Sequence, residues 1–182
     1  MNIPDPQSIP RTTMNRRPSR LCVCRLHEKN PDMLATRMTG RYLTTLAFSL
    51  LLGVGAIVLA GCLLADHQDK SGVIVFAGFG GLYLLFSLLA FRGTLSRLTV
   101  FDRAAGTFRQ RNGTAICQLD QIAALQLLPP GEMRRNGEIN LVLTDGTRLH
   151  LLSFPNDETM QQEAALLSRW LGGVAVWQNG GL

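Results

Sequence analysis

Two long apolar runs without a charged residue dominate the hydropathy pattern of the chain. They extend from Leu43 to Ala65 and from Ser71 to Phe91, and a polar tip at residues 66–70 separates them. A helix over either run is about 30 Å long or more, which matches the hydrocarbon core of a bilayer. A helix that is apolar on every face is typical of a membrane span. We therefore predict a transmembrane helical hairpin within residues 37–92; the alternative is a pair of helices buried in a soluble core.

Small residues recur within both apolar runs and predict where the two helices pack. Ala56 and Ala60 in the first run, and Ala77 and Gly81 in the second, are each four residues apart. This spacing lets helix backbones approach closely in lipid, where no hydrophobic effect drives association. We expect the helices to pack on each other at these positions; a helix of a partner protein is the alternative. Neither run contains an ionisable Asp, Glu, Lys, Arg or His, which argues against an ion pathway.

The hydrophobic period changes from helical to two after Arg92, which predicts a β domain over residues 93–182. Asn112-Gly113 and Asp145-Gly146 are strong signals for the turns of β-hairpins. The predicted strands cover residues 98–101, 107–111, 114–119, 122–128, 138–143 and 147–153, with a short final strand at 174–177. Alternation of apolar and polar residues in the hairpin around Asp145 indicates a sheet with one face in water.

One amphipathic helix is predicted after these strands. Asn156 or Asp157 can cap its start, and Gly172-Gly173 end it. Its apolar stripe consists of Met160, Ala164, Leu167 and Trp170. We expect the stripe to close the open end of the sheet; in the alternative interpretation it is a partner-binding interaction face. The predicted fold class is an α+β membrane protein, with a transmembrane hairpin followed by an antiparallel β-sheet or partial barrel and one C-terminal helix.

Residues 1–36 are predicted to form a disordered basic tail, because large apolar residues are few among them. The net charge of the chain is +5, and residues 1–42 hold 8 Lys and Arg against 3 Asp and Glu, an excess of the same size. Arginines also follow the second apolar run, whereas the tip has two Asp and one Lys. This distribution predicts a multi-pass protein of the bacterial inner membrane with both termini in the cytoplasm. It accounts for the basic charge without nucleic-acid binding.

The four cysteines, Cys22, Cys24, Cys62 and Cys117, are expected to be thiols in this topology. Cys22, Cys24 and His27 do not have the spacing of a zinc finger or ribbon, and no metal or other cofactor is predicted. Leu59-Ala60-Gly61-Cys62 matches the pattern at which bacterial lipoprotein precursors are cleaved and acylated. A lipoprotein acylated at Cys62, with translation starting at Met38, is therefore an alternative to the hairpin.

About six antiparallel strands followed by one C-terminal amphipathic helix resemble a pleckstrin-homology-like (PH-like) domain. With the hairpin before it, the layout resembles small two-span bacterial membrane proteins that carry such a domain. Including Phe101-Asp102-Arg103-Ala104-Ala105-Gly106 just after the second apolar run, it is also similar to the photosystem I assembly factor of thylakoids. The resemblance implies a PH-like fold over residues 92–177. It also implies an assembly or scaffold role, with a membrane protein or a second copy of the chain as partner.

Catalysis is not predicted, because no nucleophile occurs with its base in a recognisable motif. Two binding functions remain. In the first, the domain is a protein-interaction module held at the lipid bilayer. In the second, it senses anionic lipid through loop arginines, and the candidates are Arg109, Arg111, Arg134 and Arg135. Residues 92–182 hold 9 Lys and Arg against 8 Asp and Glu, and this near neutrality favours the interaction module.

Overall fold

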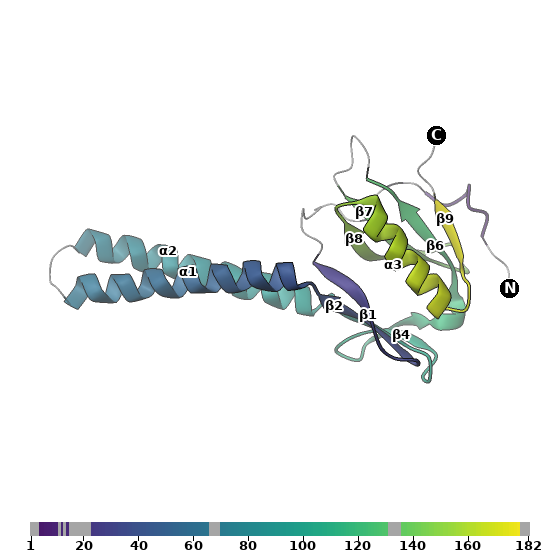
Figure 1. The fold of residues 1–182 in the computed structure, drawn as a ribbon, viewed down its shortest axis with the longest axis horizontal. Coiled ribbons are helices and arrows are strands. Elements are labelled where there is room, and N and C mark those ends of the chain that lie inside the picture. Colours follow the sequence, from purple (N-terminus) through teal and green to yellow (C-terminus); the bar gives the residue numbers. More distant parts are fainter. Residues whose placement is uncertain are drawn as a thin grey trace. The chain divides into compact units, whose positions relative to one another are not determined.

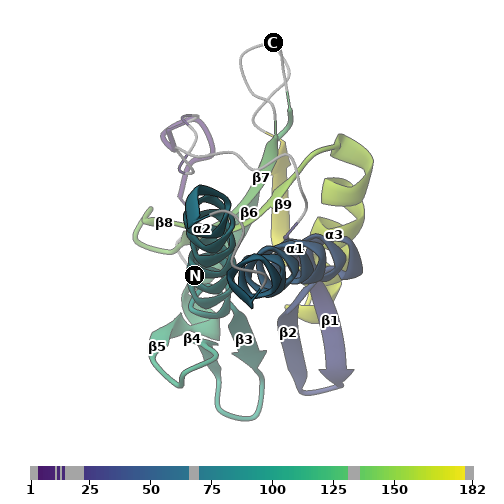
Figure 2. The ribbon, with the colours of Figure 1, turned by 90° about the vertical axis from the view of Figure 1, so that its left-hand side faces the viewer.

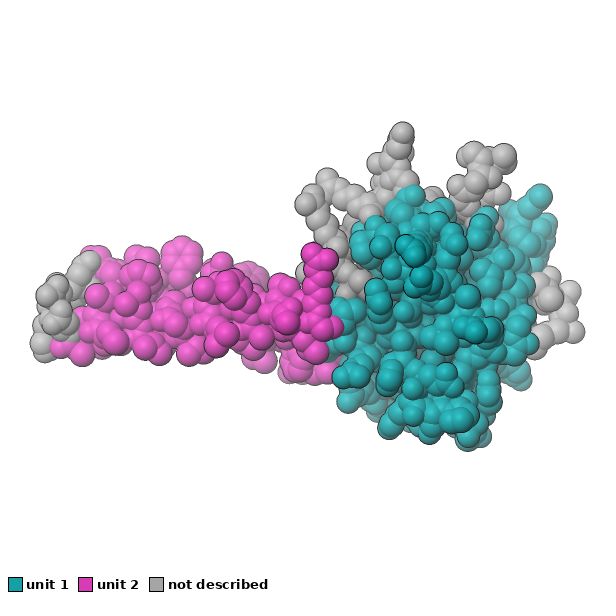
Figure 3. Space-filling model, viewed as in Figure 1, with its two compact units in different colours: residues 1–39, 98–182 teal, residues 40–97 magenta. Residues whose placement is uncertain are grey.

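The computed structural model of the protein describes residues 4–10, 12, 14, 23–65, 70–130 and 136–178. They form two long helices, two β-sheets and a helix near the C-terminus, so the predicted α+β class is confirmed (Figure 1). Over the described residues the two sheets remain separate and do not close into a barrel. The chain divides into two compact units. One unit consists of Gly40–Arg97, and the other joins Met1–Thr39 to Leu98–Leu182 (Figure 3).

The first unit is an antiparallel pair of helices, α1 (Gly40–Ala65) and α2 (Lys70–Leu95), which lie side by side (Figures 1 and 2). Both helices are long and apolar enough to cross a membrane. Each extends a few residues beyond the predicted apolar run, at the ends where Arg41 and Arg92 lie. Arginine continues a helix without difficulty, and its long side chain can reach the polar interface of a bilayer.

The contact between α1 and α2 follows a seven-residue repeat. Gly53 and Ala60 are the buried residues of α1, and the matching buried positions of α2 are Gly80, Ser87 and Thr94. A seven-residue repeat keeps one stripe of each helix facing its neighbour. Near one end of the pair, the Tyr42 hydroxyl lies 2.8 Å from the Thr94 hydroxyl and donates to the Ala90 carbonyl at 3.2 Å. Small residues and polar bonds thus hold the two helices together, as is typical of helices that pack in lipid.

The backbones approach most closely where two glycines meet. A Cβ atom built on Gly80 would lie 2.8 Å from the carbonyl oxygen of Gly53, whereas one built on Gly81 would meet no atom within 4 Å. The prediction of close packing at Ala60 is confirmed by its burial, and Ala56 is half-buried. For α2 the prediction was wrong by one residue: Ala77 and Gly81 are exposed, and Gly80 makes the close contact. Spacing alone does not distinguish adjacent glycines.

The first sheet has five antiparallel strands in the order of the sequence, β1-β2-β3-β4-β5. Its strands are β1 (Cys24–Asn30), β2 (Met33–Met38), β3 (Thr99–Asp102), β4 (Thr107–Gln110) and β5 (Ala115–Gln118). Strands β2 and β3 are hydrogen-bonded neighbours, although the whole helical hairpin separates them in the sequence. The hairpin is therefore an insertion between two paired strands, and the β domain is not confined to the predicted residues 93–182.

The prediction of a disordered tail over residues 1–36 is wrong for the part that forms β1 and β2. Leu26 and Leu34 are buried in the core, and basic residues such as Arg25 and Lys29 occupy exposed positions between and beside them. The apolar content of β1 is low, because only one of its faces contacts the core. Strand β2 pairs with β3, which lies beyond the hairpin, and β1 pairs in turn with β2.

The second sheet has the order β8-β7-β6-β9. Its strands are β6 (Ile122–Leu128), β7 (Gly137–Leu143), β8 (Arg148–Phe154) and β9 (Ala175–Gln178), and a short 3-10 helix (Leu119–Gln121) precedes β6. Helix α3 (Asp157–Trp170) connects β8 to β9, which pairs with β6 in parallel. The Asn156 side chain caps α3 by accepting the Thr159 N–H at 3.2 Å. The strands and the helix predicted after residue 98 are thus confirmed.

The core of the β domain lies among the two sheets and α3 (Figure 2). Phe101 and Phe108 of the first sheet stack with ring centroids 4.3 Å apart, and Phe101 also lies 6.1 Å from the ring of Trp170. Arg103 also contacts this tryptophan. Its guanidinium carbon lies over the Trp170 ring, 4.6 Å from the ring centroid, and its guanidinium donates to the Trp170 carbonyl. These contacts join the first sheet to the end of α3.

A buried hydroxyl continues the pairing of β2 with β3 at the point where the chain leaves for the hairpin. The Thr36 hydroxyl accepts the Thr99 N–H at 2.7 Å and donates to the Thr99 carbonyl at 3.2 Å. Thr36→Val keeps the shape but leaves this N–H unpaired, so we expect a loss of about 1–3 kcal/mol in the free energy of unfolding. Denaturant unfolding followed by tryptophan fluorescence measures it. Thr114→Val, at an exposed position, is the control, and an equal loss there would contradict the assigned role.

Candidate binding surfaces of the β domain

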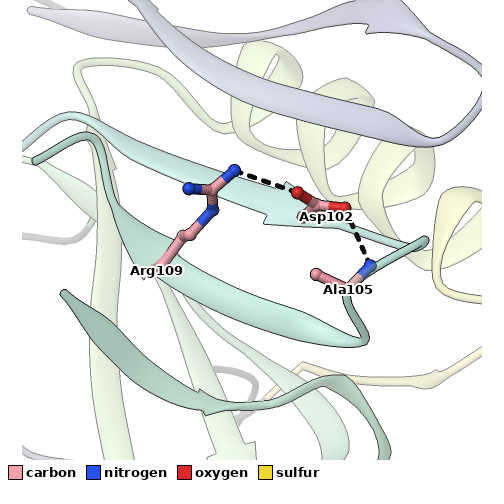
Figure 4. A network of polar contacts seen from close by, with 3 residues as sticks. All are labelled: Asp102, Ala105 and Arg109. Atoms are coloured by element: carbon pink, nitrogen blue, oxygen red, sulfur yellow. Dashed lines mark hydrogen bonds and ion pairs between the residues drawn. The ribbon is translucent and has the colours of Figure 1, made fainter. Parts of the chain in front are cut away.

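The arginines predicted to bind lipid do not form one described cluster. Arg109 lies on β4, where its Nη2 donates to the Asp102 carboxylate at 2.9 Å (Figure 4). Arg111 is exposed just after β4. Arg134 and Arg135 lie outside the described residues. Because Arg109 is half-buried and paired with a carboxylate, it is engaged within the first sheet, which argues against its predicted contact with lipid phosphate.

Asp102 stabilises the turn that follows β3. Its Oδ1 accepts the Ala105 N–H at 3.0 Å, and this bond closes the turn between β3 and β4 (Figure 4). The Ala105 N–H and the Arg109 guanidinium together lower the pKa of Asp102, against an opposing effect of desolvation. Asp145 has the same kind of role in the next hairpin, because its carboxylate accepts the Thr147 N–H at 2.8 Å and thereby has a lowered pKa.

The apolar stripe of α3 is part of the core. Its four residues are at most 6% exposed, and they are Met160, Ala164, Leu167 and Trp170. The alternative interpretation of this stripe as an interaction face is therefore wrong, because these side chains already contact the two sheets. Helix α3 instead closes the core, as the first interpretation predicted.

Glu163 of α3 covers the edge of the first sheet. Its Oε2 accepts the Leu26 N–H of β1 at 2.8 Å. Partial burial raises the pKa of Glu163, and the bond from Leu26 and the charge of Arg25 oppose this rise. A backbone N–H of the edge strand is thereby satisfied from the helix, which makes this part of β1 a poor template for an added strand.

A serine and a histidine meet on β8. His150 Nε2 lies 2.9 Å from the Ser153 hydroxyl, a contact that the irregular register between β7 and β8 permits. Sequence spacing had predicted no such pair. Because His150 is exposed, the contact is a surface hydrogen bond; a nucleophilic serine also needs an orienting third group and a stabilised oxyanion.

The cysteines and acidic residues show no metal site within the described ranges. Cys62 is exposed in the last turn of α1, and Cys117 is buried on β5. Burial, with a further contribution from the Asp120 carboxylate, raises the pKa of the Cys117 thiol to about 11. This thiol is therefore protonated and unreactive at neutral pH. Cys22 lies outside the described residues, and acylation of Cys62 stays a prediction that the mass of the purified protein would test.

The outer face of the second sheet is the most polar buried surface of the domain. We use this name for the side of β6 and β7 that faces away from the core, with the polar residues Gln126, Glu138 and Asn140 and, from β8, Arg148. Gln126 and Asn140 are fully buried, and Glu138 is 3% exposed. A face in water was predicted here from the alternation of apolar and polar residues. That prediction is wrong for Glu138 and Asn140 of β7, whereas His150 of β8 is exposed.

Residues 4–10, 12 and 14 cover this outer face (Figure 1, purple). Ile9 is 4% exposed and packs with Ala124 and Val142, and Trp177 borders the contact. Gln126 Nε2 donates to the Pro10 carbonyl at 3.1 Å, and Arg148 Nη1 donates to the same carbonyl at 2.5 Å. We call residues 4–10, 12 and 14 the N-terminal strap.

Two further groups of the strap are bound. Arg148 Nη1 also donates to the Thr12 carbonyl at 3.0 Å, and the Met14 N–H donates to Glu138 Oε2 at 3.0 Å. Gln126, Asn140 and Arg148 were not predicted as site residues from the sequence. The available signal was a polar residue in the middle of each of two apolar strands, but that signal does not show whether water or protein lies over it.

Comparison of the sequence with protein-family models finds no match, and comparison with curated proteins finds none either. The class of protein is therefore defined by the fold alone. It is an α+β protein in which two helices long and apolar enough to cross a membrane are inserted between paired strands of a two-sheet domain.

Proposed function

We propose that the protein is an integral inner-membrane protein that presents a PH-like interaction module on the cytoplasmic side, as an assembly or scaffold factor for a membrane complex. The insertion of the hairpin between β2 and β3 carries this proposal. Strand β2 ends at Met38 and α1 begins at Gly40; α2 ends at Leu95 and β3 begins at Thr99. Both connections are short, so only a few residues separate the anchor from the module along the chain.

The basic residues near the helix ends support the proposed orientation. Arg37 and Arg41 lie at the start of α1, and Arg92 and Arg97 lie at the end of α2. An excess of Lys and Arg next to membrane spans marks the cytoplasmic side. The assembly role is taken from the resemblance to pleckstrin-homology-like membrane proteins, and the pairing of Arg109 with Asp102 makes anionic-lipid sensing the weaker function.

Membrane fractionation tests the anchor. We expect the full chain to stay in the membrane pellet after an alkaline wash and to enter solution only with detergent. A variant in which Asn-Gly replaces residues 37–98 places a two-residue turn between Thr36 and Thr99, in keeping with the register of β2 and β3, and we expect it in the supernatant. Recovery of the full chain in the supernatant without detergent would overturn the proposal.

Purification in mild detergent tests the module. We expect the full chain to retain a membrane-complex subunit at a fixed stoichiometric ratio. Retention of the same subunit by the hairpin-free variant would assign binding to the β domain. A full chain that elutes as a monomer with no bound protein would argue against the assembly role.

A further inference from the structure

We propose that the outer face of the second sheet is a binding site for a peptide segment, and that the N-terminal strap is its resident ligand. A partner protein would bind by displacing the strap with a segment of the same chemistry, an aliphatic residue followed by proline. This inference rests on the proposed function and names the surface through which the module would bind.

The two faces of β6 and β7 differ in chemistry. The inner faces of β6 and β7 are apolar, with Leu125, Leu127, Ile139 and Leu141 buried in the core. The outer face places Gln126 and Asn140, both fully buried, at the centre of the same strands. Burying a polar group is unfavourable unless it is hydrogen-bonded. Apolar residues would therefore be more stable on a sheet face that is merely buried and binds nothing specific.

The polar groups of the outer face bind the main chain of the strap. The Pro10 carbonyl, the Thr12 carbonyl and the Met14 N–H are all main-chain groups of the strap. An arginine and an amide supply the donors for the carbonyls, and a carboxylate accepts the N–H. Recognition of this kind depends on the path of the peptide backbone and only weakly on side chains.

One polar atom of the outer face is unsatisfied. Asn140 Oδ1 is buried and has no hydrogen-bond partner among the described residues, while its Nδ2 donates to Gln126 Oε1 at 3.4 Å. The strap therefore does not use every polar group of the face. A peptide with an N–H group at this position would bind more completely than the strap does.

The apolar contact of the strap with the outer face is small. Ile9 is its one buried residue among those described, and the side chains beneath it, Ala124 and Val142, are small or medium in size. Pro6 lies in a turn that the Ser8 N–H closes by donating to the Asp5 carbonyl at 3.0 Å. The prolines at positions 4, 6 and 10 fix φ before binding, which lowers the entropic cost for the strap and for a competing segment alike.

A labelled peptide with the sequence of residues 4–14 is the probe, and the full chain in detergent is the receptor. We expect a variant that lacks residues 1–14 to bind the peptide at least about ten-fold more tightly than the full chain does. The reason is that a tethered ligand competes at a high effective concentration. In the truncated variant, Arg148→Ala should weaken binding at least about ten-fold, whereas Arg111→Ala, which removes an exposed charge elsewhere, should not.

The full chain with a substitution in the strap is a second receptor, which tests the inference even if the truncated chain does not fold. Ile9→Asp in the full chain places a charge in the apolar contact and should release the strap, so that the peptide binds as it would to the truncated chain. Gln7→Asp, at an exposed position of the strap, is the matched control and should leave the site closed.

Two results would overturn the inference. One is a folded Ile9→Asp chain that binds the peptide no better than the parent chain, or equally well after Arg148→Ala. The other is a concentration-dependent dimer of the full chain that Ile9→Asp abolishes, because the occupant would then be the strap of a second copy. Neither measurement requires a bilayer, so their failure is distinguishable from failure of the fractionation test of the proposed function.

Discussion

Phe101→Ala is expected to lower the free energy of unfolding of the β domain by about 3–5 kcal/mol. The ring is fully buried, stacks on Phe108 at 4.3 Å between centroids and lies 6.1 Å from the ring of Trp170. Its removal leaves a cavity where the first sheet meets α3. Because domains are stable by only about 5–15 kcal/mol, this loss is a large part of the total. Denaturant unfolding followed by the fluorescence of the neighbouring Trp170 measures it.

Two substitutions bracket this result. Phe101→Leu keeps most of the volume and should cost less than half as much as the alanine variant. Phe79→Ala removes the same ring from α2, where it is 59% exposed, and should leave the stability of the β domain unchanged. If Phe79→Ala lowered it as much as Phe101→Ala, the division of the chain into two compact units would be wrong.

The strands after residue 98 could be predicted because their signals are local. Glycine has a positive φ at each of the hairpin turns Asn112-Gly113 and Asp145-Gly146, as the turn type requires. Helix α3 was predictable for the same reason, since its cap at Asn156 and its apolar stripe both lie within a short stretch of sequence. In such segments, the residues that determine the element are also the residues that form it.

Strands β1 and β2 could not be predicted in this way, because what stabilises them lies far away in the sequence. Leu34 pairs with Phe101 across the entire helical hairpin. Polar and charged residues dominate the local composition of β1, and composition alone favoured disorder. When a long insertion separates paired strands, local sequence patterns do not predict the strands that precede it.

The outer face of the second sheet illustrates a second limit. Alternating apolar and polar residues correctly indicated which side chains of β7 and β8 share a face. They could not indicate that the N-terminal strap covers Gln126 and Asn140, because a polar side chain satisfied by water and one satisfied by a peptide backbone have the same sequence pattern. The candidate site was missed for that reason, although the sheet itself was predicted.

Gly80→Leu is expected to separate α1 from α2 and to cost about 3 kcal/mol of helix association, at the upper end of typical overpacking effects. A Cβ atom at this position would lie 2.8 Å from the Gly53 carbonyl oxygen and 2.7 Å from Ile57 Cγ1. A side chain can rotate away, but a backbone carbonyl moves only with its helix. Unfolding in mixed SDS and dodecylmaltoside micelles, followed by energy transfer between labels at the exposed positions Phe48 and Leu88, measures the effect.

Gly81→Leu is the matched control, one residue away in the same helix. Its Cβ atom would meet nothing within 4 Å, so the added side chain would point into the lipid or detergent and leave helix association nearly unchanged. The two variants also decide between the structure and the sequence pattern, since the spacing of small residues favoured Gly81. A larger loss for Gly81→Leu than for Gly80→Leu would show that the helices pack one residue out of the register described, and the contact of Gly53 with Gly80 would be wrong.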